Sequence, residues 1–100
     1  MYNSIEEQKI KADEGKPRLD LVPPELVRAV GRVRTYGVEK YGDSDSWKRV
    51  APDRYKAALL RHLMDFLDDE NSVDKESGLP HLEHAACNIA FLIELSKEGR

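Results

Sequence analysis

Apolar residues recur at helical spacing in three segments of the chain, separated by short polar stretches. In the first segment the periodic residues are Leu26, Val30, Val33 and Tyr41. Proline suits the first turn of a helix, and glycine favours the position directly after its last turn. The pattern therefore predicts a first helix that opens at Pro23-Pro24 and stops at Gly42, followed by a polar loop over residues 43–51.

Two further helices are predicted in the second half of the chain. One starts near Pro52 and runs to about Asp69. The start of the other is indicated by Ser77 and Pro80, and this helix runs to about Lys97. An acidic turn over residues 71–78 connects them. Apolar residues of the last helix extend over more than one side, which is typical of a central helix or of one used in a dimer.

The fold class expected from this pattern is all-α, because strand-like alternation of useful length is absent. We expect a small bundle of three main helices, preceded by an extended, polar N-terminal arm. The arm covers residues 1–24, with a short helical turn near residues 4–12, and the helical domain covers residues 25–100. A chain of 100 residues buries little apolar surface alone, so dimerisation is expected to complete the bundle.

Composition and charge narrow the class of partner. Charged residues make up 35% of the chain, yet the net charge is only −3, so stable binding of nucleic acid is not expected. The single cysteine, Cys87, indicates a reducing compartment. No signal core or membrane-spanning run is present, and we expect a cytoplasmic protein that binds no membrane.

Polar side chains follow the second and third helices at one repeated spacing, i, i+3 and i+7. The two sets are His62, Asp65 and Asp69, and His81, His84 and Asn88. On a helix, each set forms a narrow stripe. Antiparallel packing would then place Asp69 near His81, Asp65 near His84, and His62 near Asn88.

Facing imidazoles and carboxylates are the means by which helical bundles hold metal ions. The predicted ligands of a divalent cation are His62, Asp65, Asp69, Glu70, His81 and His84, with Asp74 and Glu76 close by. Carboxylates suit Mg²⁺, and imidazoles shift the preference toward Mn²⁺. In a purely structural alternative, His62 and Asn88 hydrogen-bond inside the bundle and the acids are a solvated helix end.

Basic and aromatic residues form a second candidate set, suited to phosphates and to a nucleobase. Its members are Lys16, Arg18, Lys40, Tyr41, Trp47, Lys48 and Arg61. Each alone also fits an ordinary surface position, and Trp47 also fits a cap on the core.

Several short motifs resemble one known family. They are residues 15–24 (GKPRLDLVPP), Lys40-Tyr41-Gly42 with Trp47, residues 60–63 (LRHL), and residues 76–88 (ESGLPHLEHAACN). Over residues 11–96 the chain resembles the phage and prophage dATP/dGTP diphosphohydrolase-type domain, which is related to the MazG-like all-α nucleoside triphosphate pyrophosphohydrolases.

The resemblance implies an enzyme that cleaves a deoxynucleoside triphosphate, dGTP in particular, between the α- and β-phosphates. In the MazG-like relatives, acids on two helices hold Mg²⁺ or Mn²⁺. Carried over, these positions fall on residues 61–65 and 81–84, where this chain has histidines in place of some acids.

Residues and resemblance together predict metal-dependent hydrolysis of a nucleoside triphosphate to the monophosphate and pyrophosphate. Glu76 or Asp65 would act as the base. The other expected roles are phosphate binding by Lys16, Arg18, Lys48 and Arg61, base stacking by Trp47 or Tyr41, and reading of the base edge by Asn88 or Asp20. We expect a homo-oligomer, dimer or tetramer, in the host cytoplasm if phage-encoded.

The alternative from another class is a non-enzymatic phage or prophage accessory protein, a helical dimer that binds a partner or an effector. Its histidines would be structural. The position of the basic residues distinguishes the two, because an enzyme needs them on the side of the metal site.

Overall fold

The structure, a computed structural model, describes residues 14–99. The helical turn expected near residues 4–12 lies outside the described residues. Three α-helices account for most of the described chain: α2 (Pro24–Tyr41), α3 (Pro52–Asp68) and α4 (His81–Lys97). Two short 3-10 helices precede α2 and α3, namely η1 (Leu19–Leu21) and η2 (Ser46–Arg49). Residues 14–99 hold no β-strand, so the all-α prediction is confirmed.

Local chemistry sets the ends of α2, as the sequence predicted. Pro24 occupies the first helical position, where no backbone donor is needed. Gly42 ends the helix in the left-handed conformation with φ of 70°, and its N–H donates to the Val38 carbonyl over 2.7 Å. The length of α2 is therefore fixed by two residues that were recognisable in the sequence.

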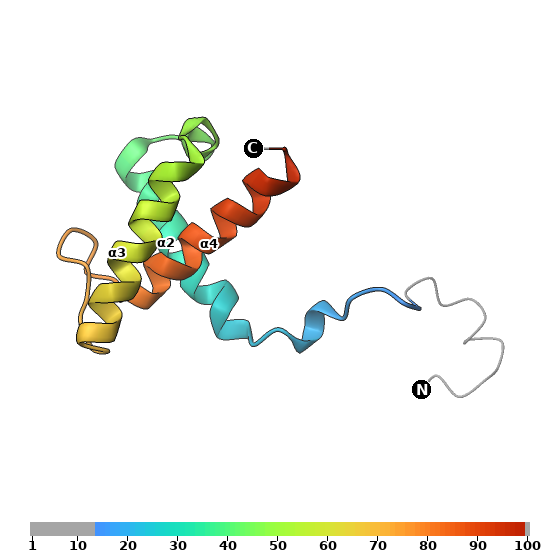
Figure 1. Ribbon diagram of the computed structural model, residues 1–100, viewed down its shortest axis with the longest axis horizontal. Coiled ribbons are helices and arrows are strands. Elements are labelled where there is room, and N and C mark those ends of the chain that lie inside the picture. The colour runs from blue at the N-terminus through green and yellow to red at the C-terminus, as the bar shows by residue number, and fades with distance from the viewer. Residues whose placement is uncertain (1–13, 100) are drawn as a thin grey trace.

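Helix α4 is the centre of the bundle, because α2 and α3 both pack on it (Figure 1). Its buried residues are Ala85, Cys87, Asn88 and Leu95, and α2 adds Val33. A bidentate ion pair between Arg32 and Glu83, with N–O distances of 2.9 and 2.8 Å, links the middle of α2 to the first turn of α4. The central position predicted for the last helix is confirmed.

The segment between α3 and α4 determines how these helices align. Val73 and Pro80 form an isolated antiparallel β-bridge, which closes the segment into a compact loop. The Ser72 hydroxyl donates to the Asp65 carbonyl over 3.2 Å, and the His81 N–H donates to the Ser72 carbonyl over 3.5 Å. The start of α4 is thereby held beside Asp65, one turn before the end of α3.

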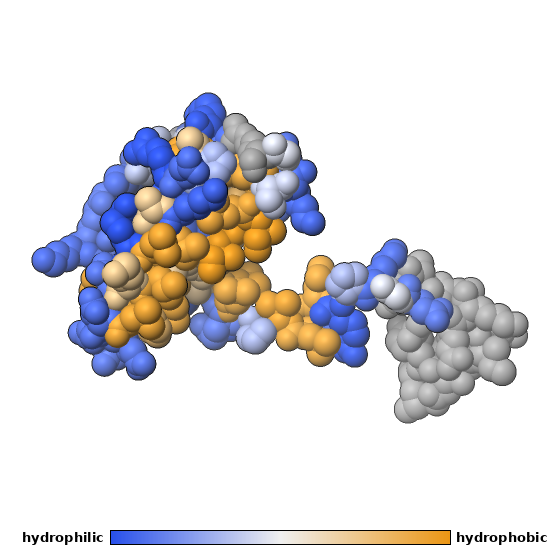
Figure 2. Space-filling model, viewed as in Figure 1, coloured by the Kyte–Doolittle hydropathy of each residue, from blue (hydrophilic) through white to orange (hydrophobic). Residues whose placement is uncertain are grey.

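An apolar surface remains exposed on α3 and α4 (Figure 2). Its large side chains are Leu60, Met64 and Leu67 on α3 and Leu82, Ile89 and Ile93 on α4. The arm before α2 is also apolar and exposed, with Leu19 at 77% and Leu21 at 70% accessibility. No helix within residues 14–99 is both long enough and apolar enough to cross a membrane.

Candidate active site

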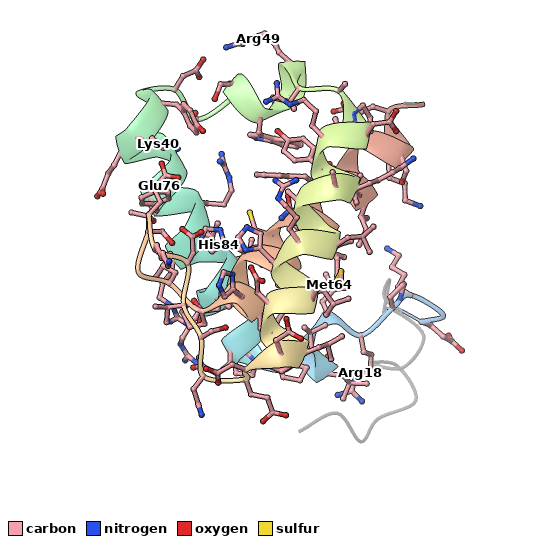
Figure 3. All side chains as sticks on the ribbon, turned by 60° about the vertical axis from the view of Figure 1, so that its left-hand side comes forward. Arg18, Lys40, Arg49, Met64, Glu76 and His84 are labelled. Carbon is pink, nitrogen blue, oxygen red and sulfur yellow. The ribbon has the colours of Figure 1, made fainter. Side chains whose placement is uncertain are left out.

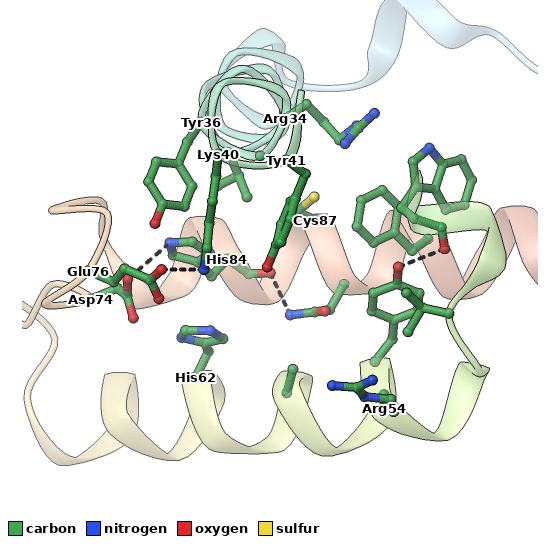
Figure 4. A pocket seen from close by; sticks show the side chains of 18 of the residues that line it. Arg34, Tyr36, Lys40, Tyr41, Arg54, His62, Asp74, Glu76, His84 and Cys87 are labelled. Carbon is green, nitrogen blue, oxygen red and sulfur yellow. Dashed lines mark hydrogen bonds and ion pairs between the residues drawn. The ribbon is translucent and has the colours of Figure 1, made fainter. Parts of the chain in front are cut away.

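A cavity of about 550 Å³ lies between α2 and α3, with α4 along its back (Figure 4). Its volume falls in the range of small-ligand sites. His62, His84, Asp74 and Glu76 lie at one end (Figure 4), and the lining also includes the packed rings of Trp47, Phe91 and Tyr55. Titratable groups and a stacking surface therefore share one concave space.

The three histidines of the chain cluster together, and two of them, His62 and His84, line this end of the cavity. The Nδ1 atoms of His62 and His81 are 2.9 Å apart, and the rings of His62 and His84 stack with centroids 4.6 Å apart. One nitrogen from His62, one from His81 and a carboxylate oxygen of Asp74 lie within 4.8 Å of one another. This group contains the donor types that bind divalent transition metals.

The loop after α3 holds Asp74 in place. One carboxylate oxygen accepts the Ser77 N–H over 2.8 Å, and the Asp74 carbonyl accepts the Gly78 N–H over 2.7 Å. Gly78 has a φ of 74°, which favours glycine at this position. The Ser77 hydroxyl is in turn 2.6 Å from His84 Nε2, so loop and histidines form one connected network.

The protonation states of His62, His84 and Asp74 favour metal binding. Burial lowers the pKa of His62, and the adjacent His84 and His81 lower it further. Burial also lowers the pKa of His84, although Asp74 opposes the shift. Burial alone would raise the pKa of Asp74, but hydrogen bonds from Ser77 outweigh it, and the pKa lies below its ordinary value. At neutral pH His62 and His84 are therefore neutral imidazoles, and Asp74 is an ionised carboxylate.

Glu76 enters the same end of the cavity but is engaged with α2. Its carboxylate pairs with Lys40, and this contact, together with a hydrogen bond from Tyr36, holds the pKa of Glu76 below its ordinary value. Figure 3 shows Lys40, Glu76 and His84 on one side of α3, with Met64 and Arg18 on the other. An ionised carboxylate is thus available beside the histidines.

The other end of the cavity is built from packed aromatic rings. Trp47 stacks on Phe91 with centroids 4.5 Å apart, and the Tyr55 hydroxyl donates to the Trp47 carbonyl over 2.7 Å. Because one face of Trp47 is covered by Phe91, the interpretation of this residue as a core cap is supported. Tyr41 also lines the cavity and is mostly exposed.

The helix pairing expected from the polar stripes is wrong by about one turn. Asp65 lies 3.7 Å from His81 instead of beside His84, and His62 lies against His81 and His84 instead of Asn88. The cause is the compact loop, in which Ser72 links Asp65 to the start of α4. The structural alternative of a His62–Asn88 hydrogen bond is also wrong, because Asn88 donates to the His84 carbonyl.

The predicted site residues separate into two sets. Those that line the cavity are Lys40, Trp47, Arg61, His62, Glu76, His84 and Asn88. Those that do not line it are Lys16, Arg18, Asp20, Lys48, Asp65, Asp69, Glu70 and His81. His81 still belongs to the metal-binding group, whereas the Asp69 carboxylate accepts the Asn71 N–H. Arg18 pairs with Asp20 on the arm, on the far side of α3 from the histidines.

Two cationic lining residues, Arg34 and Arg54, were missed by the sequence analysis. Both sit on amphipathic helices where an arginine usually faces solvent. The spacing of the arginines could have identified Arg54. It precedes Arg61 by seven residues, which places the two on one side of α3.

Comparison with known proteins gives two matches. The sequence model of the N-terminal domain of the dATP/dGTP diphosphohydrolase family matches residues 6–100. A protein of Salmonella phage PMBT28 named dATP/dGTP diphosphohydrolase is 37% identical over 86 residues. That alignment covers 86% of this chain and 29% of the phage protein, so the chain spans less than a third of its relative's length. No solved structure matches this chain.

Proposed function

The chain belongs to the dATP/dGTP diphosphohydrolase family, and from this premise we propose that it hydrolyses a purine deoxynucleoside triphosphate in the cavity between α2 and α3. The observation that carries the proposal is the convergence of the histidine–carboxylate group and several cations on one cavity. In the accessory-protein alternative, basic residues would have no reason to gather there. Lys40, Arg61 and the two unforeseen arginines do so.

We propose that Mg²⁺ or Mn²⁺ is the cofactor, held by His62, His81 and Asp74. The donor set fits, because its atoms lie within 4.8 Å of one another and the loop fixes Asp74. A divalent cation there would neutralise charge on the phosphates and lower the pKa of a bound water. His84, stacked on His62 and bonded to Ser77, would orient the ligands around it.

Between the two acids considered as the base, the geometry favours Glu76. Its carboxylate lines the cavity, whereas Asp65 does not. Pairing with Lys40 keeps Glu76 ionised and so able to accept a proton from water that attacks the α-phosphorus. Asn88, which is 8% exposed and faces the cavity, remains a candidate for contact with the substrate.

Incubation with dATP or dGTP and Mn²⁺ or Mg²⁺ is expected to give equal amounts of deoxynucleoside monophosphate and pyrophosphate. Chelation of the metal should abolish the reaction, because charge on the phosphates would be unopposed. Products are resolved by anion-exchange chromatography across the eight common nucleoside triphosphates. Deoxynucleoside diphosphate and orthophosphate as first products would contradict cleavage between the α- and β-phosphates, and no hydrolysis of any nucleotide would favour the accessory protein.

We further propose that the chain self-associates through the apolar surface of α3 and α4. An exposed surface of this kind on a small domain usually marks an interface, and the occupant expected is a second copy of the chain. The cytoplasmic location and the division at residue 24 stay predictions.

Sedimentation at micromolar concentration is expected to show a dimer or a larger oligomer. Ile93→Glu should shift the protein to monomer without loss of helicity, because Ile93 is exposed in the single chain but would be buried between copies. Thr35→Glu, on the exposed surface of α2, is the control. A monomeric wild-type protein would rule this interface out.

A further inference from the structure

Two arginines face the cavity from opposite walls, away from the histidine end. Arg34 comes from α2 and Arg54 from the first turn of α3 (Figure 4). Neither has a role in the metal-binding group. Their position instead defines a second part of the cavity that requires an explanation of its own.

Arg34 is held in position without a carboxylate. Its guanidinium donates to the Ser44 carbonyl over 2.6 Å, and it lies 5.3 Å from the ring centroid of Phe91 and 5.9 Å from that of Trp47. Such contacts orient the guanidinium but leave its charge uncompensated. The remaining donors are therefore available to a ligand.

Arg54 and Arg61 also form no ion pair with any residue of the described range 14–99. The arginines outside the cavity differ in this respect. Arg28 pairs with Glu25 and Arg49 with Asp43, with N–O distances of 2.7 and 2.8 Å. The chain carries more acids than bases, yet within residues 14–99 the arginines without a carboxylate partner are those that line the cavity.

The balance of charge in the cavity is therefore positive. Four cationic side chains line it, against the carboxylates of Asp74 and Glu76, and Glu76 is already paired with Lys40. The pKa of Tyr55 reflects this positive charge. Burial raises the pKa of its hydroxyl, and the nearby Arg34 and Arg54 partly offset the rise. Concave surfaces with uncompensated arginines attract anions, and the planar guanidinium matches the geometry of phosphate.

We propose that Arg34 and Arg54 clamp the phosphate chain of the substrate from two sides and hold the β- and γ-phosphates that leave as pyrophosphate. Arg61, next to His62 in the sequence, would contact the chain closer to the metal-binding group. The clamp rests on the proposed function for the identity of its natural ligand. Binding of a phosphate chain can nevertheless be measured without hydrolysis.

The experiment uses inorganic tripolyphosphate as the probe and metal-free protein in chelating buffer. Fluorescence of Trp47, the single tryptophan of the chain, reports binding, because Trp47 lies beside Arg34. Arg34→Gln and Arg54→Gln are each expected to weaken tripolyphosphate binding by roughly tenfold, the loss typical of one charged hydrogen bond. The control variants Arg28→Gln and Arg49→Gln remove equal charge outside the cavity and should leave the affinity within about twofold.

Unchanged affinity in Arg54→Gln would overturn the clamp, as would an equal loss in the two controls. Arg54 is the decisive position, because Arg34→Gln also removes the contact with Ser44 and can alter the fold. Arginine-dependent binding of tripolyphosphate without hydrolysis of any nucleotide would support the clamp and refute the proposed reaction. Hydrolysis with an unaltered KM in Arg54→Gln would support the reaction and refute the clamp.

Discussion

His62→Ala is expected to reduce metal-dependent hydrolysis by at least about 100-fold. His62 contacts both other histidines, 2.9 Å from His81 and stacked on His84, and it belongs to the group with Asp74. Its removal takes away a proposed ligand and the surface on which a second histidine is oriented. Initial rates at saturating Mn²⁺, together with the Mn²⁺ concentration giving half-maximal rate, measure the effect.

A purely structural role for His62 predicts a different result. The variant would then lose thermal stability and keep its specific activity at low temperature. Lys56→Ala, an exposed truncation on the same helix, controls for a general effect on α3. Full activity in a folded His62→Ala protein would contradict the metal-site proposal.

Asp74→Asn is expected to cause a loss of similar size, at least about 100-fold, with little change in melting temperature. The amide oxygen can still accept the Ser77 N–H that fixes the loop, so the loop should keep its shape. The negative charge that faces the histidines is lost, and with it the affinity for a divalent cation. Calorimetric titration with Mn²⁺ and rate measurements on the same preparation test both parts.

Asp68→Asn is the matched control for this change. Asp68 ends α3, is exposed, and forms no ion pair within residues 14–99. Its substitution removes the same charge from the same end of the bundle and should leave the rate unaltered. Equal losses in the two variants would attribute the effect to net charge instead of to a cation site at Asp74.

The helices were predictable because local residues determine them, whereas their alignment was not. Pro24 and Gly42 bound α2 through backbone preferences that act within a few residues. The pairing of His62 with His81 depends instead on the bridge between Val73 and Pro80, which no periodic pattern records. An error of one turn moved every predicted contact between the stripes, although the histidines were the right residues.

The basic residues that line the cavity were likewise only partly predictable from the sequence. Arg61 was selected because it adjoins His62 in the sequence, and it does line the cavity. Arg34 was not, because only the packing of α2 on α4 brings it over Phe91. Arm residues such as Arg18 were selected for their positive charge, but the fold of a single chain does not bring them to the cavity. Proximity in sequence predicted site membership better than residue type did.

The packing of α2 and α3 on α4, more than on each other, has a consequence for how the protein responds to its ligand. The two walls of the cavity, α2 and α3, are each held mainly by α4, and the ion pair between Lys40 and Glu76 links α2 to the loop after α3. A molecule bound by side chains from both helices would restrain the motion of α2 relative to α3. Binding of such a molecule is therefore expected to make the bundle more rigid, and slower amide hydrogen exchange in α2 and α3 would measure the change.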